Sequence, residues 1–368
     1  MDADRLLSTF LDLVRIDSPS RDEAAVAAYC KEALEQAGCS VRIDETMAFT
    51  GSNTGNLIAT LPGTRPGKLY FSAHMDTVNP GQGIRPCIID GIIRAGGDTV
   101  LGGDDKVGIA AIIELVRCLA KEERPHPEIG VLFSVCEEIS LLGAQAMDSG
   151  DFGGEPCLVL DGEGKPGTII IGSPFNYKFK ATFTGKAAHA GIAPEKGVSA
   201  ISIAAKAILG MELGRLDDKT TANVGTIQGG NANNIVADSC VVTGEFRAMD
   251  EPRVAQVRAQ LSSAMDDAAA LMGGAVSVEW VREYPGFTVE ETDPLVQRLL
   301  LQARALGLEA QAVMSGGGSD ANIYTDKGLM ALVFGTGMAD VHGLSESLAI
   351  RDLEDLAHLC ISIALGWY

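Results

Sequence analysis

The sequence predicts an α/β protein with a mixed sheet, into which a smaller α+β domain is inserted. The 368 residues correspond to two or three domains at roughly 150 residues each. Short apolar runs alternate with helical patterns as far as Gly172, a different alternating pattern follows, and the first pattern returns after Pro285. We therefore expect a larger domain over 1–174 and 285–368, and a smaller domain over 175–284.

The N-terminal part alternates helices with short apolar runs. Leu6, Phe10 and Val14 recur at helical spacing. Ser20 to Glu23 match a capping box that would begin a second helix, which Gly38 would end. Apolar runs of this kind indicate a largely buried sheet. The next expected elements are apolar runs over 56–61 and 68–74, a helix over 106–120, an apolar run over 129–136, a helix over 141–148 and an apolar run over 157–160.

The middle of the chain shows the alternation of a sheet with one buried face, because Phe179, Ala181 and Phe183 share one side of a strand. This part is expected to form strands over 177–184, 223–228, 239–248 and 275–281, with helices over 198–209 and 251–271. After Pro285 we expect a helix over 293–306, strands over 310–314 and 329–335, and a helix over 352–366.

Composition excludes several classes of protein. Apolar residues make up 46% and charged residues 21%, as in folded globular proteins rather than disordered or collagen-like ones. The net charge of −20 disfavours nucleic acid and anionic membranes as partners. The acidic start does not resemble a secretory signal, and no apolar run approaches the roughly 18–20 residues of a transmembrane helix. Eight scattered cysteines read as free thiols, so we expect a cytoplasmic protein.

A glycine-rich segment over 162–167 matches the G-x-G-x-x-G pattern of dinucleotide sites. In those sites the glycine turn leads directly into a helix. Here Pro166 interrupts the segment, and Thr168 to Ile171 have the character of a strand. The segment is therefore not expected to bind a nucleotide.

Histidine and acidic residues follow the ends of predicted strands, and one further acid, Asp104, opens a predicted helix. Each has an ordinary interpretation when taken alone, such as a surface pair or a helix cap. Together they mark the sheet edge where open α/β sheets bind ligands. Histidine and carboxylate ligands without cysteine suit zinc, manganese or cobalt. The residues concerned are His74, Asp76, Asp104, Glu137, Glu138, Asp161 and His342.

The remaining histidines are less informative. His126 lies between two prolines in a polar stretch and is expected to be exposed, and His358 sits within the last helix. His189 ends a strand of the inserted domain among small residues, which leaves a structural and a functional interpretation equally open.

These segments resemble the M20 metallopeptidases in order and spacing along essentially the whole chain, and within them the peptidase T-like branch. The resemblance implies a zinc-peptidase catalytic domain with an inserted lid and dimerisation domain. The branch is indicated by residues 75–113 and 185–197. The segments that carry the family resemblance are His74-Met75-Asp76-Thr77-Val78, Leu101-Gly102-Gly103-Asp104-Asp105-Lys106, Cys136-Glu137-Glu138, Asp161, Gly185-Lys186-Ala187-Ala188-His189 and Val341-His342-Gly343.

The resemblance also implies a centre that holds two zinc ions, with manganese or cobalt as other candidates. Asp104 would bridge the two ions, Asp76 would orient a ligand histidine, and Glu137 would be the general base acting on the bridging water. The other ligands would be His74, Glu138, Asp161 and His342.

The lid domain would contact a short peptide substrate. In family members the residue corresponding to His189 stabilises the oxyanion, often from the partner subunit, so a homodimer through the lid is implied. Asn234 and Arg247 resemble lid residues that touch the substrate, and Gly317 lies in a substrate-lining loop over 316–320.

The expected activity is release of the N-terminal residue from short peptides such as tripeptides. Ala237 and the Leu344-Ser345-Glu346 segment depart from the family pattern, which puts a strict tripeptide preference in question. A deacylase of N-acyl amino acids or a carboxypeptidase would use the same metal centre and stays open. A non-catalytic binding protein on this fold is less favoured, because all seven positions of the centre are present.

Overall fold

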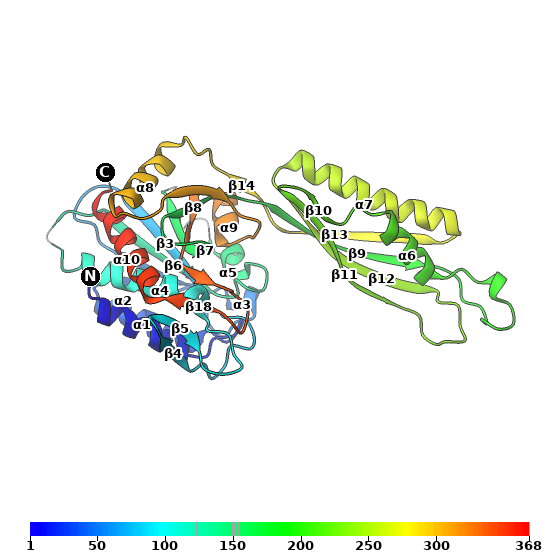
Figure 1. Ribbon diagram of the computed structural model, residues 1–368, viewed down its shortest axis with the longest axis horizontal. Helices are drawn as coiled ribbons and strands as arrows, with labels where there is room; N and C mark the ends of the chain where they lie inside the picture. The colour runs from blue at the N-terminus through cyan, green and yellow to red at the C-terminus, as the bar shows by residue number, and fades with distance from the viewer. Residues whose placement is uncertain (123, 149, 151, 153–154, 368) are drawn as a thin grey trace. The chain divides into compact units, whose positions relative to one another are not determined.

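The computed structural model describes residues 1–122, 124–148, 150, 152 and 155–367, and it divides into two compact units (Figure 1). Unit 1 comprises residues 1–172, 288–315 and the chain from Ser319 onward. Unit 2 comprises Ser173–Phe287 and Gly316–Gly318. A mixed α/β layer fold in unit 1 and an antiparallel α+β fold in unit 2 confirm the expected fold class.

Unit 1 is built on a mixed sheet whose central strands β6, β3, β7 and β16 run parallel to one another. These strands are apolar and buried on both faces, as is typical of parallel strands covered by helices. The order is β1-β2-β6-β3-β7-β16-β8-β14, with β15 beside β8. The strands are β1 (Ser40–Ile43), β2 (Leu57–Leu61), β3 (Lys68–His74), β6 (Glu128–Ser134), β7 (Cys157–Gly162), β8 (Thr168–Ser173), β14 (Phe287–Thr288), β15 (Gln311–Met314) and β16 (Ala331–Gly335).

Helix α4 is the centre of the helical layer. It is buried along nearly its whole length and packs on β3 and β7, while α1, α2 and α10 cover it. Its apolar residues occupy every side, which is the pattern of a helix enclosed by protein. The helices of unit 1 are α1 (Ala3–Arg15), α2 (Ala24–Gln36), α3 (Met47–Thr50), α4 (Gly103–Leu119), α5 (Leu142–Ala146), α8 (Pro294–Ala305), α9 (Asp320–Asp326) and α10 (Ile350–Leu365).

A small antiparallel sheet in unit 1 has the strand order β17-β18-β5-β4. Its strands are β4 (Pro86–Ile89), β5 (Ile92–Ala95), β17 (Met338–Ala339) and β18 (Ser347–Ala349). The loop between β17 and β18 carries His342, so the pairing of β18 with β5 anchors one end of that loop.

Unit 2 is an antiparallel sheet with α6 and α7 on one face (Figure 1). Phe179, Ala181 and Phe183 are buried with the two helices, whereas Lys178 and Lys180 on the other face are exposed, as the alternation predicts. The strand order is β10-β11-β12-β9-β13. The elements are β9 (Phe175–Thr184), a 3-10 turn η2 (Pro194–Lys196), α6 (Ala200–Gly210), β10 (Gly214–Asp217), β11 (Thr220–Gly229), β12 (Ser239–Ala248), α7 (Glu251–Met272) and β13 (Ala275–Tyr284).

Several local expectations can be checked directly. The glycine-rich segment over 162–167 connects β7 to β8 rather than to a helix, which confirms that it lacks the dinucleotide-binding arrangement. The capping box is wrong, because Glu23 makes no side-chain cap on α2 and instead turns into the interior. His126 is buried, not exposed, since its Nδ1 lies 2.9 Å from the Pro127 carbonyl oxygen and Thr64 bonds its backbone.

None of the helices among the described residues has both the length and the apolar character needed to cross a membrane. All eight cysteines are free thiols, and six of them are buried.

Candidate active site

The acidic and histidine residues at the strand ends meet at one edge of the unit 1 sheet. His74 ends β3, Asp161 lies near the end of β7, and Glu138 follows β6. Because these strands are parallel, their carboxyl ends lie at the same edge. The His74 Nε2 atom is 3.1 Å from Asp104 Oδ1 and 3.9 Å from Asp161 Oδ1.

His342 completes the cluster from the β17–β18 loop. Its Nε2 atom lies 3.0 Å from Glu138 Oε1 and 3.2 Å from Asp104 Oδ2. The side chain is 51% exposed, whereas that of His74 is 2% exposed. The two imidazoles therefore approach the two oxygens of one carboxylate, that of Asp104, from a buried side and an open side.

The donor atoms form groups in which every member lies within 4.8 Å of the others. Two of these groups share Asp104, and each contains one histidine and two carboxylates. Nitrogen and oxygen donors in sets of three suit zinc and similar divalent ions. The groups are His74 with Asp104 and Asp161, Asp104 with Glu138 and His342, and His74 with Glu137 and Glu138.

The carboxylates of Asp104 and Asp105 have different partners, since one lies in the cluster and the other bonds to backbone N–H groups. Both residues have non-helical dihedrals at the start of α4, and the peptide bond between them is cis. The Asp105 carboxylate accepts hydrogen bonds from the backbone N–H groups of His74 (3.2 Å) and Gly108 (3.1 Å). Asp105 thus fixes the end of β3, while the carboxylate of Asp104 lies among the other metal-donor side chains of the cluster.

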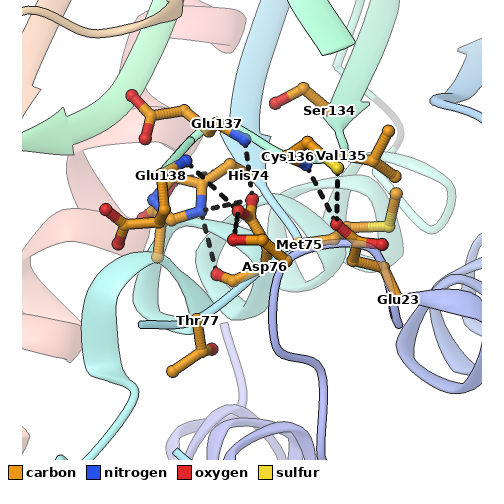
Figure 2. A network of polar contacts seen from close by, with 12 residues as sticks. Glu23, His74, Met75, Asp76, Thr77, Ser134, Val135, Cys136, Glu137 and Glu138 are labelled. Atoms are coloured by element: carbon orange, nitrogen blue, oxygen red, sulfur yellow. Dashed lines mark hydrogen bonds and ion pairs between the residues drawn. The ribbon is translucent and has the colours of Figure 1, made fainter. Parts of the chain in front are cut away.

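Asp76 connects His74 to the segment that carries the two glutamates (Figure 2). The Asp76 carbonyl oxygen lies 3.0 Å from His74 Nδ1, which leaves Nε2 to face the cluster. Its buried carboxylate accepts hydrogen bonds from the Ser20 hydroxyl (2.7 Å) and from the backbone N–H groups of Glu137 (2.9 Å) and Glu138 (3.2 Å). Asp76 therefore orients His74 through its carbonyl oxygen and holds the backbone of the acidic pair through its carboxylate.

Glu23 holds Cys136, the residue before the two glutamates. This role of Glu23 was not identified from the sequence. Its fully buried carboxylate accepts a hydrogen bond from the Cys136 backbone N–H (3.0 Å) and one from the Ser52 hydroxyl. Cys136 has a φ of 55°, so the backbone turns sharply where β6 has ended. Consecutive N–H groups at 136–138 thus point to two buried carboxylates, as Figure 2 shows. The sequence signal was an acid beside the second helix, which fits a helix cap equally well.

Lys106 stabilises the segment that follows β3 through two hydrogen bonds. Its ammonium group is fully buried and donates hydrogen bonds to the Met75 carbonyl oxygen and the Thr77 hydroxyl, both at 2.7 Å. Burial lowers the pKa of the Lys106 amine, and the surrounding aspartates oppose this effect. The lysine thereby closes the turn that presents Asp76.

The cluster concentrates negative charge in a buried place. Burial raises the pKa of the Glu137 carboxyl well above its ordinary value, and neighbouring carboxylates raise it further despite the opposing charge of His74. Burial, followed by the charge of Asp104, also raises the pKa of Asp161. For Asp104, burial acts upward, but hydrogen bonds from His342 and His74 outweigh it and lower the pKa. A buried group of carboxylates with this electrostatics is stabilised by a cation.

The residues predicted in the inserted domain form two pairs within unit 2. Exposed His189 and Asn234 lie on adjoining loops, since the Ala190 N–H donates to the Asn234 carbonyl oxygen at 2.9 Å. The Arg247 guanidinium donates to the Gly316 carbonyl oxygen at 2.9 Å, next to Gly317. These residues offer an imidazole, an amide and a guanidinium at the surface of unit 2.

Each of the two units matches a model of a known protein family. A family model of the M20 peptidase dimerisation domain matches residues 176–272 in unit 2, and a model of peptidase family M28 matches residues 56–151 in unit 1.

Relatives match along nearly the whole chain. The structure of aminopeptidase PepT from Bacillus cereus is 40% identical, with a TM-score of 0.93 over 99% of this chain and 98% of its own. A tripeptidase structure from Staphylococcus aureus is 36% identical, with a TM-score of 0.95 over the same shares. The uncharacterized protein YqjE of Bacillus subtilis is 40% identical over 361 residues, which are 98% of this chain and 97% of its own.

Proposed function

Because this chain belongs to the M20 metallopeptidase family, in its peptidase T-like branch, we propose that it is an aminopeptidase that releases the N-terminal residue of short peptides such as tripeptides. The observation that carries the proposal is the pair of donor groups that share Asp104. Similarity to an aminopeptidase and a tripeptidase over nearly the full chain supports the choice of substrate class.

Two zinc ions are the proposed cofactors, with manganese or cobalt as the alternatives. Asp104 would contribute to both ions. When bound, the ions supply Lewis-acid polarisation of the peptide carbonyl and a lower pKa for the attacking water. The ligands would be His74 and Asp161 for one ion, and Glu138 and His342 for the other.

Glu137 is the proposed general base. Its carboxyl lies among the donors of the cluster, and its raised pKa suits a group that accepts a proton from water and passes it to the leaving amine. Asp76 is a positioning residue for this step, because it holds the backbone N–H of Glu137 and orients His74.

The unit 2 residues are proposed to bind the substrate. The His189 imidazole would donate a hydrogen bond to the developing oxyanion. The Asn234 amide and Arg247 guanidinium would pair with polar groups of the peptide backbone, and Gly317 would line the same space.

We further propose a cytoplasmic homodimer that forms through unit 2. Its match to a dimerisation domain supports this, as does the exposure of Leu209 on α6 at 89%. Light scattering on the purified protein should give twice the mass of one chain, and a monomer at micromolar concentration would contradict the dimer.

The activity is tested by mass spectrometry on zinc-loaded protein with the tripeptide Ala-Gly-Phe and its N-acetylated form. Three different residues reveal which end is cleaved. We expect alanine and Gly-Phe from the free peptide and no product from the acetylated one. Release of phenylalanine would indicate a carboxypeptidase, and release of acetate would indicate a deacylase; either result overturns the aminopeptidase proposal.

A further inference from the structure

Glu346 is a buried carboxylate that the proposed chemistry leaves without a role. It lies on the β17–β18 loop and is 2% exposed. Its Oε2 accepts a hydrogen bond from the Gly102 N–H (2.9 Å), and its Oε1 accepts one from the Asp104 N–H (3.1 Å). The side chain thus joins its own loop to a segment 242 residues away in the chain.

The contact between the two segments is close. Gly102 has a φ of 65°, and a Cβ added at Gly103 would lie 3.1 Å from Glu346 Oε1. The backbone over 102–104 therefore packs directly on the carboxylate.

The same loop carries His342, whose backbone has a φ of 64° and whose ring is half exposed. Bonds from the Gly343 N–H to the Asp340 oxygen and from the Glu346 N–H to the Gly343 oxygen shape the loop locally. The Glu346 side chain ties the shaped loop to the segment that carries Asp104. Its two hydrogen bonds accordingly fix how far His342 stands from Asp104.

We propose that Glu346 is a positioning residue that sets the geometry of the Asp104–Glu138–His342 group and thereby its affinity for an ion. The inference rests on the proposed two-ion function. The group around His74 and Asp161 has separate supports, because Asp76 orients its histidine and β7 carries its second carboxylate. Both groups share Asp104, but only the Asp104–Glu138–His342 group takes a ligand from the loop that Glu346 holds. Loss of the Glu346 carboxylate should therefore weaken ion binding more at this group than at the group around His74 and Asp161.

The variant Glu346→Gln tests this directly. A glutamine amide presents one acceptor oxygen and one donor NH2 group, so one of the two backbone N–H groups loses its acceptor. Removing such a support for metal ligands costs about 10–100-fold in metal affinity. We expect the ion at the Asp104–Glu138–His342 group to bind at least about tenfold more weakly. The ion at the group around His74 and Asp161 should bind within about threefold of its original affinity.

The readout is zinc content per chain by elemental mass spectrometry after dialysis, together with zinc titration against a chromophoric chelator. Glu309→Gln makes the same change at an exposed position of unit 1 and should leave both affinities unchanged. Circular dichroism shows whether the variants are folded. Glu346→Asp keeps both acceptor oxygens but places them on a shorter side chain. If Glu346→Gln does not fold, Glu346→Asp should show the same larger loss of zinc affinity at the Asp104–Glu138–His342 group.

The outcomes separate the two proposals. A wild-type protein that binds fewer than two ions would contradict the two-ion function itself. If the wild type binds two ions, then unchanged affinities in the Glu346 variants, or equal weakening of both ions, would overturn the positioning role of Glu346.

Discussion

Unit 1 and unit 2 hold their candidate functional residues in opposite ways. In unit 1 the side chains are mostly buried, and carboxylates such as Asp76 and Glu23 hold the backbone that presents them. In unit 2, His189 and Asn234 are exposed and lie on loops joined by a backbone bond. Buried polar groups that are fully paired form rigid networks, which fix their geometry. The difference separates a site held by buried contacts, which suits the proposed bond cleavage, from an exposed surface, which suits the proposed substrate recognition.

The comparison is tested most strongly at Glu137. In Glu137→Gln we expect kcat to fall about 10²–10⁴-fold, because the amide cannot accept the water proton. Zinc content and unfolding free energy should stay near the wild-type values. Steady-state kinetics with elemental analysis measures both. Retained turnover would show that another group is the base.

An ion pair in unit 1 between a buried carboxylate and a partly exposed guanidinium provides the next largest effect. The Glu114 carboxylate is fully buried and takes two hydrogen bonds from the Arg5 guanidinium at 2.8 and 2.9 Å. Arg5→Ala leaves this charge without its partner, which should cost about 2–4 kcal/mol in the unfolding free energy. Urea denaturation measures the loss. Adding Glu114→Gln to Arg5→Ala should recover part of it, and no recovery would argue against the unpaired charge as the cause.

The same pair predicts a pH dependence. Burial acts to raise the pKa of Glu114, but the hydrogen bonds from Arg5, the Asp2 backbone N–H and Cys118, together with the charge of Arg5, outweigh it and lower the pKa. Stabilisation by a lowered carboxyl pKa is present above the ordinary value of about 4.3 and disappears as the pH falls through the folded-state value. The stability difference between wild type and Arg5→Ala should therefore shrink as the pH is lowered from 7 towards 3. A gap that stays constant would contradict this linkage.

Arg247 probes recognition in unit 2. Arg247→Ala removes a guanidinium whose hydrogen bonds to a charged peptide group would be worth about 1.5–3 kcal/mol. We expect KM for the tripeptide to rise about 10–100-fold, with zinc content unchanged. The exposed Arg282→Ala on β13 is the matched control and should leave KM unaltered. Equal KM values for both variants would remove Arg247 from the substrate contacts.

The smallest effect is expected at the ion pair of Arg253 with Asp217 in unit 2. The Arg253 Nη2 atom lies 2.9 Å from Asp217 Oδ2, but both side chains are partly open to water. Exposed pairs of this kind contribute up to about 1 kcal/mol. Arg253→Ala should therefore destabilise the protein less than Arg5→Ala does, as urea denaturation of the two variants can show. The reverse order would contradict the contrast between the units.

The meeting of the strand-end residues could be predicted from sequence because it follows from a general rule. Apolar runs revealed the strands that end near His74, Cys136 and Asp161. Parallel strands bring their carboxyl ends to one edge, so the side chains after them converge whatever the details of packing. No such rule applies to His189, Asn234 and Arg247. Only the family resemblance identified them as candidate functional residues.

The supports of the site could not be predicted, because their partners are distant in sequence. Ser20 to Glu23 match a local capping pattern, yet Glu23 pairs with a backbone group 113 residues away. Glu346 likewise pairs across the chain with the Asp104 segment. Local propensity describes neighbours in sequence, whereas burial decides which tertiary partner a carboxylate takes.

The order of the ligand residues along the chain has a consequence for biosynthesis. Chains fold from the N-terminus as they leave the ribosome. The group around His74 and Asp161 is translated before unit 2, while His342 and Glu346 are translated after it. A nascent chain that already contains Glu137, the proposed general base, therefore still lacks His342 from its second donor group. Under the proposed two-ion function, a chain in which His342 has not yet been translated is therefore expected to be inactive towards peptides.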